Sequence, residues 1–85
     1  MPKSVFTDAY VSMVDDLVAL RKQSGVSQVE LAQRLGKTQQ FVSSVEQRIR
    51  RLDVIELYAY VRAIGGNPEG VVVSLFRRLP SEISI

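Results

Sequence analysis

Four polar side chains lie close together in one segment of this chain, and their types suit hydrogen bonding to a ligand. They are Gln39, Gln40, Ser43 and Ser44. A glutamine amide holds a donor and an acceptor side by side, the pair that matches the edge of an adenine in the major groove of DNA. Because Val42 and Val45 have the spacing of a buried helix face, the polar side chains would lie elsewhere on the same helix. The segment therefore indicates a helix that can read DNA.

A second helix is predicted immediately before this segment. Ser27 is a typical N-cap, and Glu30 three residues later predicts a capping box. The helix would run from Gln28 to Leu35, with three apolar residues facing inward, namely Leu31, Ala32 and Leu35. Gly36 would end it in the left-handed conformation.

Thr38 is then expected to cap a third helix, of about Gln39 to Gln47. Two short helices joined by a tight turn form a helix-turn-helix, in which the second helix enters the major groove of DNA. We therefore interpret the chain as a DNA-binding protein whose recognition helix starts at Gln39.

The first helix is predicted from Asp8 to Gln23, with Thr7 as its N-cap and Gly25 just past its end. Its apolar stripe consists of Tyr10, Met13, Val14, Leu17 and Val18. Arg21 continues this stripe. A guanidinium on an inward face needs a partner, because an unpaired buried charge is very unfavourable.

Two more helices are predicted after a basic connector, from Gln47 to Leu52. Asp53 and Glu56 form a capping box for the fourth helix, whose core stripe consists of Leu57, Tyr60, Val61 and Ile64. Gly65 and Gly66 would end this helix, Asn67 would cap the last one, and Pro68 suits its first position. The last helix would extend to about Arg78. The run from Val71 to Val73 favours β-structure by propensity, so a short strand is the alternative there.

These elements predict an all-α fold: one compact five-helix domain, with a core of about residues 7–79, a short N-terminal arm and a C-terminal tail. With 85 residues the chain can bury only a modest core, so association with a second copy would add stability.

Composition excludes several classes of function. The chain has no cysteine and no histidine, which rules out disulfides and removes the commonest metal ligands and proton shuttles. It also lacks a Gly-rich phosphate loop, so we expect no enzyme activity, no cofactor, no metal and no small-molecule ligand. No apolar run approaches the roughly 20 residues that cross a bilayer, and no signal peptide is evident. We expect a cytoplasmic, nucleoid-associated protein.

The net charge is only +2, but the charge is unevenly distributed. Residues 21–51 contain seven basic and two acidic side chains, whereas the segments before and after them are both slightly acidic. The positive charge therefore lies on the helix-turn-helix and the following loop, where phosphate contacts would be needed. From this position we expect Lys37, Arg48, Arg50 and Arg51 to approach phosphates.

The chain resembles the Cro/C1-type helix-turn-helix family, the XRE-like regulators with a lambda-repressor-like fold. The resemblance covers about residues 10–66 and rests on the segments LRKQSGVSQVELAQRLG, KTQQFVSSVEQ and LYAYVRAIGG. It implies a bundle of four or five helices that binds operator DNA, usually as a dimer.

The resemblance also implies roles for single residues. Gln28 matches a position that commonly anchors a phosphate, whereas Gln39, Gln40 and Ser44 match positions that meet base edges. Thr38 and Ser43 match positions that contact a phosphate or a base. Arg21 and Glu46 match an ion pair that ties the first helix to the end of the recognition helix.

The sequence departs from the family pattern in three places. Gln47 and Arg48 replace the usual Asn-Gly or Arg-Gly, which predicts a longer or more helical turn. Phe41 occupies a position where tyrosine or a small polar residue is frequent, and we interpret it as a packing residue. The C-terminal SEISI has no family counterpart.

The sequence thus predicts a transcriptional regulator, a repressor that binds a palindromic operator as a homodimer. A stripe on the last helix is the expected dimer interface, consisting of Val72, Leu75, Phe76 and Leu79. The alternative for this stripe is closure of the bundle. The alternative function is a protein-interaction module, such as an antitoxin that neutralises a partner protein and regulates its own operon. A controller of a restriction-modification operon would be a variant of the same class.

Overall fold

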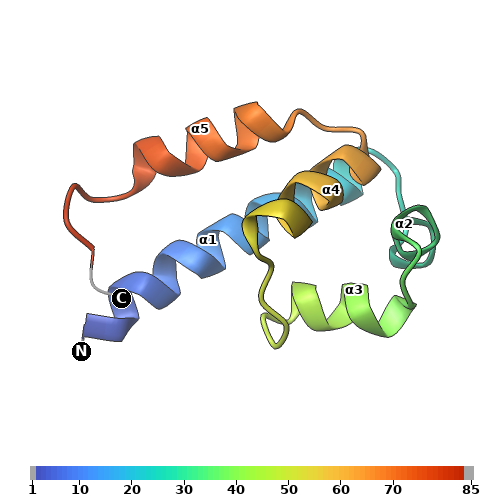
Figure 1. The fold of residues 1–85 in the computed structure, drawn as a ribbon, viewed down its shortest axis with the longest axis horizontal. Helices are drawn as coiled ribbons and strands as arrows, with labels where there is room; N and C mark the ends of the chain where they lie inside the picture. Colours follow the sequence, from blue (N-terminus) through green and yellow to red (C-terminus); the bar gives the residue numbers. More distant parts are fainter. Residues whose placement is uncertain (1, 84–85) are drawn as a thin grey trace.

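Five α-helices make up the fold of residues 2–83 (Figure 1). The computed structural model describes residues 2–83, and it describes side chains from residue 8 onward. The helices are α1 (Pro2–Gln23), α2 (Gln28–Leu35), α3 (Gln39–Glu46), α4 (Val54–Ile64) and α5 (Pro68–Arg78). Residues 2–83 contain no β-strand, so the all-α prediction is confirmed and the alternative strand at Val71 to Val73 is wrong.

The first helix begins earlier than the sequence indicated. It starts at Pro2 instead of Asp8, so Thr7 lies within the helix and does not cap it, and residues 2–6 of the predicted N-terminal arm are helical. Proline suits the first turn of a helix because its missing N–H would be unpaired there in any case. No glycine or second proline interrupts the residues from Lys3 to Asp8. The helix therefore continues through Thr7 toward the N-terminus, and Thr7 does not mark its start.

The other helix starts follow the predicted caps. The Oγ of Ser27 accepts a hydrogen bond from the N–H of Glu30 at 3.0 Å, and the Oγ1 of Thr38 accepts one from Phe41 at 3.1 Å. The capping box of α4 is complete. That of α2 is only half formed, because the Glu30 carboxylate pairs with Arg34 one turn further on, at 2.6 Å.

The last helix starts as predicted, with Asn67 capping it and Pro68 in its first turn. Val71 and Leu75, four residues apart, pack against the core from this helix. This i, i+4 packing against the core, together with the cap, outweighs the β-propensity of the three valines, because a strand would have no partner strand among the described residues.

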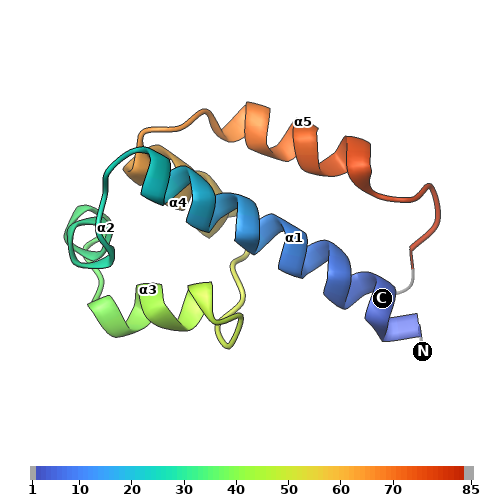
Figure 2. The ribbon, with the colours of Figure 1, turned by 180° about the vertical axis from the view of Figure 1, so that it is seen from behind.

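The core lies between α1 and α4 and the helix-turn-helix. Figures 1 and 2 show α2 and α3 on one side of the layer formed by α1 and α4, with α5 on the other side. The predicted stripes supply most of the buried side chains, which are Met13, Val14, Leu17, Leu31, Ala32, Val42, Val45, Tyr60, Val61 and Ile64. Val26, in the loop before α2, is also buried. None of the described helices is long and apolar enough to cross a membrane.

Candidate nucleic-acid interface

The turn between α2 and α3 presents the start of α3 to solvent. Gly36 has a φ of 69°, and its N–H and that of Lys37 bond back to the carbonyls of Gln33 and Ala32. This left-handed turn reverses the chain within two residues, so α3 begins beside α2. Val42 and Val45 are buried, whereas Gln39 and Gln40 in the first turn are exposed.

Several polar side chains of α3 are hydrogen bonded to each other. The amide of Gln40 donates to the Oγ of Ser44 at 3.4 Å, and the amide of Gln47 donates to the Oγ of Ser43 at 2.9 Å. Each serine hydroxyl therefore accepts from a glutamine one turn away and keeps its own proton for donation. The glutamine oxygens remain acceptors, so this surface offers both donors and acceptors.

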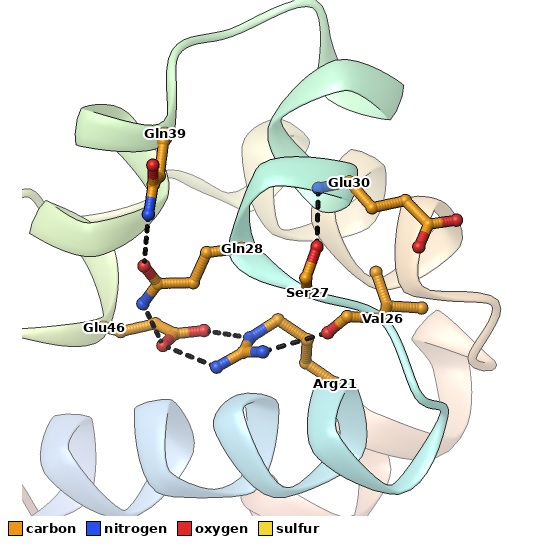
Figure 3. A network of polar contacts seen from close by, with 7 residues as sticks. All are labelled: Arg21, Val26, Ser27, Gln28, Glu30, Gln39 and Glu46. Atoms are coloured by element: carbon orange, nitrogen blue, oxygen red, sulfur yellow. Dashed lines mark hydrogen bonds and ion pairs between the residues drawn. The ribbon is translucent and has the colours of Figure 1, made fainter.

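A buried ion pair lies beneath this surface (Figure 3). The Nε of Arg21 is 2.5 Å from Oε2 of Glu46, and its Nη2 is 3.0 Å from Oε1. The side chains are only 9% and 11% exposed. The third donor of Arg21, Nη1, bonds to the carbonyl of Val26 at 2.9 Å. The structure thus provides the partner that an inward-facing arginine requires, and the Glu46 hydrogen bond raises the pKa of Arg21.

The ion pair continues outward through two glutamines. The Nε2 of Gln28 donates to Oε1 of Glu46 at 2.8 Å, and the Nε2 of Gln39 donates to Oε1 of Gln28 at 3.4 Å. Figure 3 shows the four side chains as one line of contacts from α1 through the start of α2 to the start of α3. The Arg21–Glu46 pair was expected from the sequence, whereas Gln28 and Gln39 were expected only as separate DNA contacts, and nothing in the sequence indicated that they connect to the pair.

The basic residues flank α3 at both ends. Lys37 lies before the helix, with its Nζ 5.5 Å from the centre of the Phe41 ring, and the guanidinium of Arg50 lies 5.3 Å from the same ring. Arg51 stacks over Tyr10 at 4.2 Å. Phe41 itself is half-buried and packs against the core, so it supports the cations that lie on either side of it.

Arg50 has an acidic partner that sequence reasoning missed. Its Nη1 and Nη2 lie 3.2 and 2.6 Å from the carboxylate of Glu56, and Nη1 also donates to the carbonyl of Arg51. These hydrogen bonds lower the pKa of Glu56, and the backbone N–H of Asp53 adds to the effect. The sequence assigned Glu56 only to the capping box, which it also completes. The residues between Arg50 and Glu56 include an irregular connector, so their spacing in the sequence did not predict this contact.

The turn after α3 is tight, which corrects the prediction of a longer or more helical one. The N–H groups of Arg48 and Ile49 bond to the carbonyls of Val45 and Ser44, at 3.0 and 2.9 Å. Arg48 occupies the left-handed region with a φ of 64°. It therefore adopts the conformation that the family's glycine provides, without being glycine.

The predicted stripe on α5 is divided between the core and the surface. Leu75 packs against the core, which supports bundle closure for this residue, and Leu79 is half-buried. Phe76 is 65% exposed. Val72 lines an apolar groove of about 280 Å³ between α4 and α5, whose other lining residues are Val54, Leu57, Tyr58, Pro68, Glu69 and Val73. The exposed apolar surface therefore extends from α5 onto α4.

Comparison with known proteins agrees with this geometry. The helix-turn-helix family model HTH_3 matches residues 17–71. The chain is a Cro/C1-type helix-turn-helix protein. Among solved structures, it is similar to an XRE-family like protein from Pseudomonas syringae pv. tomato str. DC3000, with 40% sequence identity and a TM-score of 0.87. That match covers 92% of this chain and 95% of the other. No curated protein matches the chain significantly.

As a member of this family, the protein is a DNA-binding regulator. The matched segment contains the whole of α2, α3 and α4, together with Arg21, Glu46 and the basic connector. Most of α5 lies beyond it. The family match therefore includes the exposed polar side chains of α3 but not the exposed Phe76 of α5.

Proposed function

We propose that this protein is a sequence-specific repressor that acts on the nucleoid and binds a palindromic operator as a homodimer. The observation that carries the proposal is the first turn of α3, where Gln39 and Gln40 are exposed, with Lys37 before the helix and a cluster of arginines in the connector after it. Amides can specify adenine by paired hydrogen bonds, and cations hold the flanking phosphates.

The two kinds of contact have different expected roles. Gln39, Gln40 and Ser44 would meet base edges, and Thr38 and Ser43 would meet a base or a phosphate. Phosphate contacts would come from the residues around them, which are Gln28, Lys37, Arg48, Arg50 and Arg51. Phosphates would set the position and orientation of α3, and the glutamines would select the sequence. Arg50 would exchange the Glu56 carboxylate for a phosphate oxygen.

The apolar groove between α4 and α5 supports the proposed homodimer. Three residues that line this groove are well exposed, namely Val54 at 77%, Tyr58 at 56% and Val73 at 46%. Apolar side chains that gather on one surface favour burial against a partner, and a two-fold axis lets the same surface serve both copies. Two copies would place their α3 helices in half-sites about one helical turn apart.

Selection of bound duplexes from a random pool at physiological salt tests the proposal. We expect an enriched, approximately palindromic sequence whose half-sites contain adenine at the position that Gln39 reads. A pool without any enriched sequence would overturn sequence-specific binding and favour a protein-interaction module, such as an antitoxin, instead.

A matched pair of variants tests the assignment of base contacts. Gln39→Ala should weaken binding to the selected site by about 1 to 3 kcal/mol and leave binding to random DNA nearly unchanged. Gln33→Ala makes the same chemical change at an exposed position of α2 outside this surface, and we expect it to leave both affinities unchanged. Equal losses on specific and random DNA in Gln39→Ala would contradict a base-reading role.

A further inference from the structure

We infer that Glu46 is a positioning residue that decides which hydrogen-bonding groups Gln39 offers to a base. This inference rests on the proposed function and goes beyond a stabilising role for the Arg21–Glu46 ion pair. It depends on the direction of each hydrogen bond in the line of contacts shown in Figure 3.

The first step is the orientation of the Gln28 amide. A carboxylate can only accept hydrogen bonds, and Oε1 of Glu46 already accepts from Arg21 at 3.0 Å. The amide group of Gln28 meets the same oxygen at 2.8 Å. Its nitrogen must face Glu46, because an amide oxygen there would meet a carboxylate oxygen. The oxygen of Gln28 is therefore directed toward Gln39.

The second step transfers this polarity to Gln39. The oxygen of Gln28 accepts from Nε2 of Gln39 at 3.4 Å, so Gln39 uses one of its two amide hydrogens inside the protein. It keeps one N–H and its oxygen for DNA. A donor and an acceptor side by side match N7 and the N6 amino group of adenine.

The opposite orientation of the Gln28 amide would change which groups Gln39 offers to a base. If the Gln28 nitrogen faced Gln39, it would take up the oxygen of Gln39 and leave two N–H donors free. Two donors match O6 and N7 of guanine, which are both acceptors. Glu46 can only accept hydrogen bonds, and it therefore favours adenine over guanine at the position that Gln39 contacts, although it reaches Gln39 only through Gln28.

The placement of Glu46 suits a positioning role. Its side chain is 11% exposed, and both of its oxygens are bonded to Arg21, which is itself fixed to the carbonyl of Val26. Glu46 is the last residue of α3 and Gln39 is the first, so Gln28 connects the two ends of the helix from α2. The polarity is thus held by groups that have little freedom to rearrange.

The experiment is a competition between two duplexes that carry adenine or guanine at the position read by Gln39. That position is the one whose preference disappears in Gln39→Ala. We expect Glu46→Gln to reduce the preference for adenine at least about fivefold relative to the parent, because a glutamine can donate to the Gln28 oxygen and allow the reversed amide. The ratio compares duplexes bound by the same folded molecules, so a change in the folded fraction does not alter it.

Two further variants separate positioning from stability. Gln28→Met removes the connection without touching the ion pair, and it should lower the adenine preference with little change in melting temperature. Arg21→Lys disturbs the buried pair but keeps the Glu46 carboxylate, and it should lower the melting temperature with the parent's preference intact.

Three results would overturn the inference. They are an unchanged preference in Glu46→Gln, an unchanged preference in Gln28→Met, and a parent protein that prefers guanine at this position. A parent protein that enriches no sequence would overturn the proposed function itself, and this inference with it.

Discussion

At the scale of single residues, Glu46 contacts both the buried Arg21 and Gln28, so its carboxylate has a part in stability and, as proposed, in recognition. Arg21 is the one buried charged residue among the residues that the structure describes. Its hydrogen bonds go to Glu46 and to the carbonyl of Val26. A buried ion pair adds little net stability compared with apolar residues of similar volume, but removal of one partner leaves an uncompensated charge. The pair is therefore sensitive to single changes.

Glu46→Ala should reduce the free energy of unfolding by about 3 kcal/mol, because it leaves the Arg21 guanidinium buried without a counter-charge. The double variant Arg21→Met with Glu46→Leu should lose less than half as much, since neither charge remains. Urea unfolding followed by far-UV circular dichroism measures both. A double variant that is less stable than Glu46→Ala would show that the charges themselves stabilise the fold.

Glu56 links the pH dependence of stability to Arg50. Hydrogen bonds from Arg50 hold the pKa of Glu56 below its usual 4.5 in the folded protein. The unfolded chain therefore takes up a proton at higher pH than the folded one, so this stabilisation is present above pH 4.5 and is lost as the pH falls through the folded-state pKa. Glu56→Gln should reduce the fall in stability between about pH 5 and about pH 3.

Thermal melts across this pH range measure the effect. Arg50→Met removes the main cause of the lowered pKa and should likewise flatten the profile. A Glu56→Gln profile that parallels the parent's over the whole range would contradict the assigned role of the Arg50–Glu56 pair.

At the scale of the helices, four of the five end in the same kind of turn. After α1, α2 and α4 the left-handed residue is a glycine, namely Gly25, Gly36 and Gly65, whereas after α3 it is Arg48. A residue with a Cβ pays about 1–2 kcal/mol for this conformation. The turn at the end of the recognition helix is therefore the strained one.

Arg48→Gly should stabilise the protein by about 0.5 to 1 kcal/mol, since relief of this strain exceeds the added entropy of glycine in the unfolded chain. Arg48→Ala removes the same side chain but keeps the Cβ, so we expect its melting temperature to stay close to the parent's. Differential scanning calorimetry distinguishes the two. Equal melting temperatures for Arg48→Gly and Arg48→Ala would mean that the turn carries no strain.

The helices show what local sequence signals can and cannot predict. Both ends of α2 and the start of α5 were predicted to the residue, because Ser27, Gly36, Asn67 and Pro68 act through their own backbone neighbours. The start of α1 was missed, because Pro2 is compatible with the first turn of a helix but does not by itself predict one. In the candidate site, residue types on α3 indicated DNA, but the contacts of Gln28 with Glu46 and of Arg50 with Glu56 depend on how separate elements pack.

At the scale of the whole molecule, the two proposed functional surfaces lie on different helices. The polar side chains and flanking cations belong to α2, α3 and the following connector, whereas the apolar groove lies between α4 and α5. Figure 1 shows α3 and α5 on opposite sides of the layer formed by α1 and α4. One copy can therefore present α3 to DNA and its groove to a second copy at the same time. The proposed dimer requires this separation, since both half-sites must be occupied without hiding either recognition helix.

Two valines of nearly equal exposure allow a matched test of the dimer. Val73 lines the groove and is 46% exposed, whereas Val29 lies on α2 and is 48% exposed. Val73→Asp would place a charge in the proposed interface, where it would lose water without gaining a partner. We expect it to weaken self-association at least about tenfold, corresponding to about 1.4 kcal/mol, with little change in the melting temperature of the monomer.

Val29→Asp should leave self-association unchanged. Sedimentation equilibrium over a range of protein concentrations measures self-association of both variants. Equal effects of the two substitutions would show that the groove is not the interface. A parent protein that stays monomeric with and without DNA would contradict the dimer itself.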